Sequence, residues 1–197
     1  MYSKKHFIGI LLSACLLFSF DVKNNYQQVK EYLSVPGPVE FNKTIFSLSW
    51  SSHPNNSYYK QEYLPAGERS ETFSKMIMIE ALVGELTPKE AMMNKVAELD
   101  ERKKSDPVTN YQFIQNPSTG EYLLDFVISS NGIVEWNAYR YTTLKDKAAG
   151  KGIVLFACSK RAYGKAGTGF LKALKTERVK DINTLAVYKI PEIKIKP

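Results

Sequence analysis

"IVLFACS", residues 153–159, is apolar at every position before Ser159. A strand that is covered on both faces reads as a continuous apolar run, whereas a strand with one wet face alternates. We therefore expect these residues to form a central strand of a sheet, with Phe156 buried against a helix. In such surroundings Cys158 is predicted to be a buried, inert thiol rather than a nucleophile.

Alternating runs elsewhere in the chain predict further strands. "TIFSLSW" (residues 44–50) places Phe46, Leu48 and Trp50 on one face, and the strand that follows a turn-rich connection reads as its partner. Trp136 is expected to be buried against a helix. The other predicted strands are "YYKQEYL", "FSKMIMIEALV", "NYQFIQ", "EYLLDFVISS" and "IVEWNAYRYTTL", at residues 58–64, 73–83, 110–115, 121–130 and 133–144.

Two helices are predicted. The first is "TPKEAMMNKVAEL" (residues 87–99), where Thr87, Pro88 and Glu90 form the N-terminal pattern of a capping box. The second covers most of residues 169–190, where apolar residues recur near helical spacing. The predicted fold class is therefore α+β, with a mostly antiparallel sheet, one helix after the third strand and one C-terminal helix.

The N-terminus has the layout of a secretory signal peptide. Lys4 and Lys5 precede "FIGILLSACLLFSF" (residues 7–20), which is uncharged but shorter than the roughly 20 apolar residues of a membrane-spanning helix. We expect an exported protein, periplasmic or outer-membrane associated in a Gram-negative cell and secreted otherwise. The predicted division is a signal peptide, a polar lead-in, a single α+β domain and a basic tail, at residues 1–20, 21–40, 41–190 and 191–197.

Cys15 leaves two forms of export open. Leu12-Ser13-Ala14-Cys15 resembles a bacterial lipobox, in which the cysteine becomes the acylated N-terminus. The residues that follow Cys15 stay apolar, which favours ordinary cleavage near Ser19. The mature protein is thus either a lipoprotein or a soluble secreted protein.

Positive charge is concentrated at the C-terminal end. The chain has a net charge of +7, and residues 160–197 hold ten Lys or Arg against three acidic residues. Lys172, Lys175, Arg178 and Lys180 are predicted to spread over the exposed side of the terminal helix. They are the candidate binding residues for an anionic lipid or an acidic envelope protein; the alternative is an ordinary solvated helix face. Nucleic acid is not an expected partner of an exported protein.

Few residues suit catalysis or metal binding. His53 is the only histidine left after the signal peptide, so metal sites and histidine-based triads have one candidate, and we expect no metal or cofactor. Two carboxylates on neighbouring strands would suit a hydrolase, although the spacing of the acidic residues in the sequence does not indicate which two would act together. The carboxylates in this part of the chain are Glu62, Glu68, Glu71, Glu80 and Glu85.

The order of these elements resembles the PsbP-like fold of extrinsic photosynthetic proteins and of bacterial periplasmic lipoproteins. The likeness covers residues 41–187. It rests on an exported N-terminus, an early strand "FSLSW", the helix "TPKEAMMNKVAEL", the hairpin around "GEYLLDFVISS" and the terminal helix "GFLKALK". Members of that fold mostly bind or assemble with other components, so the resemblance implies no catalytic residues. We therefore expect a non-catalytic binding or assembly factor of the cell envelope, with an envelope hydrolase using acidic residues as the alternative.

Overall fold

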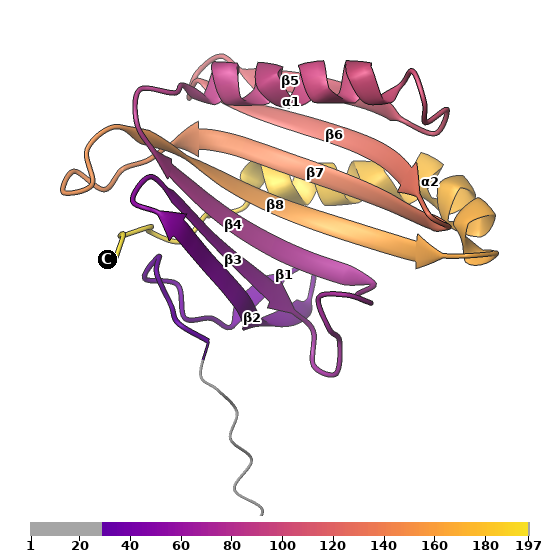
Figure 1. Cartoon of the computed structure of the whole chain (residues 1–197), viewed down its shortest axis with the longest axis horizontal. Helices are drawn as coiled ribbons and strands as arrows, with labels where there is room; N and C mark the ends of the chain where they lie inside the picture. Colours follow the sequence, from indigo (N-terminus) through magenta and orange to yellow (C-terminus); the bar gives the residue numbers. More distant parts are fainter. Residues whose placement is uncertain (1–28, 197) are drawn as a thin grey trace, which may run out of the picture.

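A computed structural model describes residues 29–196 as one antiparallel sheet with two helices (Figure 1). The sheet has eight strands in the order β1-β2-β3-β4-β8-β7-β6-β5. The helices are α1 (Pro88–Arg102) and α2 (Ala166–Val187). The strands are β1 (Val39–Phe41), β2 (Thr44–Asn55), β3 (Tyr58–Leu64), β4 (Lys75–Val83), β5 (Asn110–Asn116), β6 (Glu121–Ser130), β7 (Ile133–Thr143) and β8 (Gly152–Tyr163).

The apolar strand β8 lies at the centre of the sheet, as predicted. It pairs with β4 on one side and β7 on the other, and residues 152–159 are all buried. Helix α1 packs on β5, β6 and β7, whereas α2 packs on β7 and β8. Because successive side chains of a strand point to opposite faces, β8 contributes Phe156 to the core beneath α2 and Leu155 to the core beneath α1.

The predicted burial of Trp136, Phe156 and Cys158 is confirmed. Trp136 and Phe156 are buried in the core that α2 covers. Cys158 is buried and unpaired, and its burial raises the pKa of the thiol to about 12. A thiol with so high a pKa is protonated at neutral pH and is a poor nucleophile.

The first helix follows the fourth strand, not the third as predicted. The additional strand is β1, which pairs with the start of β2 and has two of its three residues, Val39 and Glu40, in the segment predicted to be a polar lead-in. Three residues are too few for an alternating pattern to stand out. The predicted start of α1 is correct: the Glu90 amide donates to Thr87 Oγ1 at 3.2 Å, and the Thr87 amide donates to Glu90 Oε2 at 2.9 Å.

Trp50 does not share the buried face of β2 with Phe46, contrary to the expectation from alternation. The register between β2 and β3 shifts between Leu48 and Trp50, and Trp50 is exposed while Phe46 is buried. A bulge inserts an extra residue into one strand, which ends the simple alternation of faces beyond it.

The segments on either side of the predicted domain pack on the sheet and on each other. The Lys194 amide donates to the Leu33 carbonyl at 3.1 Å, and the Lys196 amide donates to the Tyr32 carbonyl at 2.8 Å. Leu33 and Ile193 both belong to the core beneath α2. Packing within the described residues therefore extends beyond residues 41–190 in both directions.

The signal peptide predicted at residues 1–20 and the predicted lipid attachment at Cys15 lie outside the described residues. Within residues 29–196, neither helix is long and apolar enough to span a bilayer.

Candidate functional site

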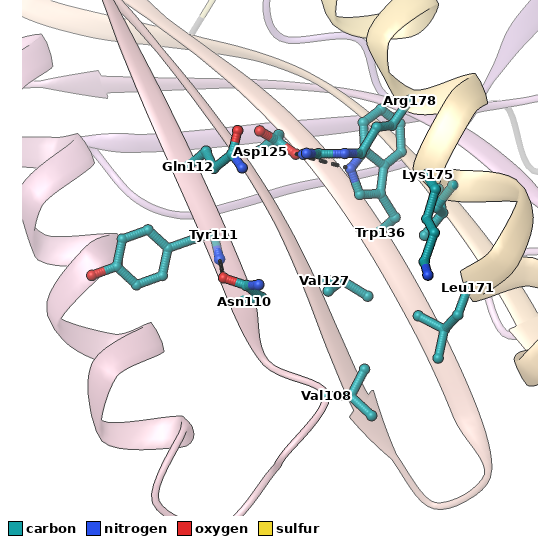
Figure 2. Close-up of a pocket in the computed structure, with 11 residues that line it drawn as sticks. Val108, Asn110, Tyr111, Gln112, Asp125, Val127, Trp136, Leu171, Lys175 and Arg178 are labelled. Atoms are coloured by element: carbon teal, nitrogen blue, oxygen red, sulfur yellow. Dashed lines mark hydrogen bonds and ion pairs between the residues drawn. The ribbon is translucent and has the colours of Figure 1, made fainter.

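An apolar cavity with a charged border lies beside α2. Because α2 packs over β7 and β8, the same face of β5 and β6 is left open, and a cavity of about 290 Å³ forms between that face and the helix. Figure 2 shows its lining, in which the Tyr111 ring points away from the cavity and toward α1. The lining residues are Val108, Asn110, Tyr111, Gln112, Asp125, Val127, Trp136, Leu171, Leu174, Lys175 and Arg178.

An ion pair between a buried carboxylate and a half-buried guanidinium group lines this cavity. Asp125 is buried in the middle of β6 and pairs with Arg178 of α2 (Figure 2). The Trp136 Nε1 donates to Asp125 Oδ2 at 3.5 Å, so the carboxylate has partners from both the helix and β7. Lys175, one turn before Arg178, is exposed and has no ion-pair partner in the described part of the chain. The charge left over in this cavity is therefore the positive charge of Lys175.

A second cavity of about 110 Å³ continues along the same side of α2. Its lining includes the next residues on the same face of β5 and β6. Gln112 and Asp125, which line the first cavity, are a cross-strand pair, and the next pair on that face, Ile114 and Leu123, lines the second. Its lining residues are Ile114, Asn116, Glu121, Tyr122, Leu123, Arg140, Ile182, Asn183 and Ala186. We call the two cavities together the α2 groove.

Arg140 of β7 holds the far end of α2 against the sheet. Its Nη1 donates to the carbonyl oxygens of Leu185 at 3.0 Å and Tyr188 at 2.7 Å, and its Nη2 donates to Glu121 Oε2 at 2.8 Å. A cation at the C-terminal end of a helix also interacts favourably with the helix dipole. The position of α2, and with it the width of the second cavity, therefore depends on this arginine.

The four candidate binding residues of α2 do not form one exposed face. Lys172 and Lys180 are exposed and line neither cavity, whereas Lys175 borders the larger cavity. Arg178 is turned toward the sheet and paired with Asp125, so the expectation that it lies on the exposed side is wrong. The reason is that residue 178 follows the inward-facing Leu171 and Leu174 at helical spacing.

Sequence reasoning missed the polar part of the groove. The sequence pattern indicates an apolar strand around Asp125 and a core position for Trp136, and no site for either. A lone acidic residue inside "EYLLDFVISS" was the available signal, because a charge buried within a sheet requires a partner. The sequence could not show that this partner is Arg178, 53 residues further on.

Glu62 and Glu80, two of the candidate carboxylates, come together around a lysine, and Glu62 also lines an open cavity of about 360 Å³ with Glu68 and Glu71. Lys60 Nζ lies 2.9 Å from Glu62 Oε1 and 3.9 Å from Glu80 Oε1. Burial raises the pKa of Glu80, and the nearby Lys60 and Tyr58 lower it by less. His53 stacks on the Tyr59 ring with the centroids 4.1 Å apart, which is a packing role. Within residues 29–196, no three His, Cys, Asp or Glu side chains gather into a metal site.

These features describe an α+β protein with an open groove between its C-terminal helix and one end of its sheet. The chain belongs to the protein family whose model matches residues 33–190, a range that includes all eight strands and both helices. No curated protein and no solved structure matches the chain.

Proposed function

We propose that the protein is an exported, non-catalytic binding protein of the cell envelope, and that its α2 groove holds an extended acidic segment of a partner protein. The observation that carries this proposal is the line of two cavities beside α2, with the unpaired ammonium group of Lys175 at the edge of the larger one. Apolar side chains of the partner would enter the cavities, and an acidic side chain would pair with Lys175.

The spacing of the cavities suits an extended chain. Gln112 borders the first cavity and Asn116 borders the second, four residues further along β5. At 3.4 Å per residue this is about 14 Å, the distance between side chains i and i+4 of an extended segment. Those two side chains point to the same side of the segment, so both could enter the groove at once.

The electrostatics favour an acidic protein segment over an anionic membrane surface. Arg178 neutralises Asp125, which leaves Lys175 as the free charge beside apolar walls. A flat lipid surface requires several cations on one face of the helix. Lys172 and Lys180 are exposed but border neither cavity, so Lys175 is the lysine of α2 that brings an unpaired charge to the apolar walls of the described groove.

The alternative, an envelope hydrolase, would depend on Glu80, because a carboxyl group with a raised pKa is suited to general acid catalysis. Lys60 lies between Glu80 and Glu62, however, where a substrate bond would have to sit. This arrangement supports a structural ion-pair cluster, and we favour binding. The resemblance to the PsbP-like fold supports the same choice, since its members mostly bind or assemble.

Export is tested at the N-terminus. If Cys15 is acylated, cells labelled with palmitate are expected to mark the wild type, while Cys15→Ala stays unlabelled and is retained as the precursor. Sequencing the N-terminus of the mature protein provides the second measurement. A mature chain that begins after Cys15 contradicts the lipoprotein form and supports a soluble secreted protein.

Binding is tested with peptides that have leucine at two positions four residues apart and glutamate between and beside them. The chain has two tryptophans, and Trp136 forms part of the cavity floor, so its fluorescence is expected to change when such a peptide binds to a Trp50→Phe variant. Lys175→Glu is expected to weaken binding about tenfold, because it replaces an attractive charge with a repulsive one.

Lys172→Glu is the matched control, because it makes the same charge change on an exposed lysine that borders neither cavity. It is expected to weaken binding by less than about threefold, because only the long-range electrostatic attraction, which salt screens, is reduced. Equal effects of the two reversals would argue against the groove. Binding to anionic vesicles but not to the peptides would instead indicate a lipid surface.

A further inference from the structure

Strand β5 is an exposed edge of the sheet with none of the usual protection. It pairs with β6 through a continuous register from Asn110 to Asn116, and no strand among the described residues lies on its other side. Its sequence, "NYQFIQN", contains no charge, proline or glycine. Soluble proteins normally protect an edge with charges, prolines, bulges or a very short strand, and the opposite edge, β1, has only three residues.

Apolar side chains are exposed on both faces of this edge. Phe113 is 49% exposed and Ile114 is 61% exposed, and consecutive residues of a strand point to opposite faces. Helix α1 contacts this strand through Tyr111, whose hydroxyl donates to Asp100 Oδ1 at 2.9 Å, yet Phe113 and Ile114 stay exposed. The outer half of β5 therefore offers free backbone groups with an apolar side chain above and below them.

The sequence of β5 is close to self-complementary. In an antiparallel pair centred on Phe113, each Phe113 lies opposite its copy, Asn110 lies opposite Asn116, and Gln112 lies opposite Ile114. Like residues thus meet at the centre and at both ends, and no like charges face each other. A two-fold symmetric interface requires such self-complementarity, because the same patch contributes both sides.

We propose that β5 pairs antiparallel with β5 of a second copy of this chain, which joins the two sheets into one. The self-complementary pattern favours a second copy over a strand from another protein, for which no palindrome is needed. The two-fold axis would run perpendicular to the sheet at Phe113, so both copies of α2 would lie on the same face. The two α2 grooves would then lie side by side, with the Gln112 and Ile114 side chains of both copies between them.

Lysine placed on the edge tests the proposal. The protein, purified in the form in which the cell exports it, is studied by sedimentation equilibrium over a dilution series. The wild type is expected to dimerise, and Ile114→Lys is expected to weaken dimerisation at least about tenfold, because each lysine would lie opposite Gln112 and diagonally across the pair from the other lysine, on the same face, where the two charges repel. Ile45→Lys is the matched control, since Ile45 is equally exposed at 61% but lies in β2 near the other edge. It is expected to leave dimerisation unchanged.

A cysteine at the centre of the pair tests the register. Opposed Cα atoms in an antiparallel pair are about 4.5–5.5 Å apart, within the range of a disulfide. Phe113→Cys is expected to give a disulfide-linked dimer under mild oxidation. Ile45→Cys and the unsubstituted chain are expected to stay unlinked. These two controls show whether Cys15 forms cross-links of its own.

A wild type that is monomeric at every concentration overturns the proposal and leaves the edge to a strand from another protein. Equal weakening by Ile114→Lys and Ile45→Lys overturns it as well. So does equal cross-linking of the Phe113→Cys and Ile45→Cys variants, because that would show random collision rather than a paired edge. Peptide binding by the groove is measured separately, through Trp136 fluorescence in the Trp50→Phe variant, so its failure is distinguishable from failure of the pairing.

Discussion

Phe156→Ala is expected to lower the free energy of unfolding by about 3–5 kcal/mol, the cost of truncating a large aromatic residue in a core. Phe156 is fully buried in the central strand β8. Its ring stacks on Tyr188 with the centroids 4.8 Å apart and lies 6.4 Å from the Phe41 ring. Removing the ring would leave a cavity that β1, β8 and the end of α2 all border. For a domain of this size, the melting temperature should fall by about 6–20 °C.

The two tryptophans supply the control for this prediction. Trp136→Ala is expected to destabilise the protein by a similar amount, about 3–5 kcal/mol, because Trp136 is buried in the same core. Trp50→Ala is expected to cost less than about 1 kcal/mol, because Trp50 is exposed on β2. Thermal unfolding followed by circular dichroism measures all three variants. An unchanged melting temperature for Phe156→Ala would contradict the central position of β8.

Asp106→Ala is expected to lower the free energy of unfolding by about 3 kcal/mol, because it leaves several buried donors without an acceptor. The Asp106 carboxylate accepts hydrogen bonds from the Ser129 amide at 2.6 Å, the Thr109 hydroxyl at 2.8 Å, the Val108 amide at 3.1 Å and Arg102 Nε at 3.2 Å. These bonds connect the end of α1 to the end of β6. Glu101→Ala is the control, because the Glu101 carboxylate is exposed in its pair with Lys104.

The contribution of Asp106 is expected to depend on pH. Burial raises the pKa of Asp106, but the hydrogen bonds from Ser129, Thr109 and Arg102 outweigh it and hold the pKa well below its usual range. The stabilisation is thus complete above the unfolded pKa of about 3.9 and is lost as the pH falls from there toward the folded pKa. Urea unfolding at pH 7 and pH 3 should show a smaller difference between wild type and Asp106→Ala at pH 3. A difference that grows at pH 3 would contradict this assignment.

Local sequence patterns determined most of the secondary structure of this protein. The apolar run at residues 153–159 indicated the central strand, because a strand with two covered faces has no polar positions to alternate. The Thr87 to Glu90 capping box marked the start of α1 correctly, because both of its hydrogen bonds lie within one turn of the helix. Signals of this kind depend on residues that are neighbours in the chain, and they survive whatever the tertiary fold becomes.

Only the tertiary structure decided the site. The Asp125–Arg178 pair joins residues on β6 and α2 that are 53 positions apart, and helical spacing can turn Arg178 inward with Leu171 and Leu174 but cannot identify its partner or the cavity that Lys175 borders. The exposure of Trp50 depends on a bulge against β3, and the exposure of Phe113 and Ile114 depends on β5 being the last strand of the sheet. The α2 groove, the Asp125–Arg178 ion pair and the exposed edge at β5 all depend on which strands pair and on how far α2 reaches across the sheet. Burial depends on contacts between distant segments of the chain, and the pattern within a single segment does not show those contacts.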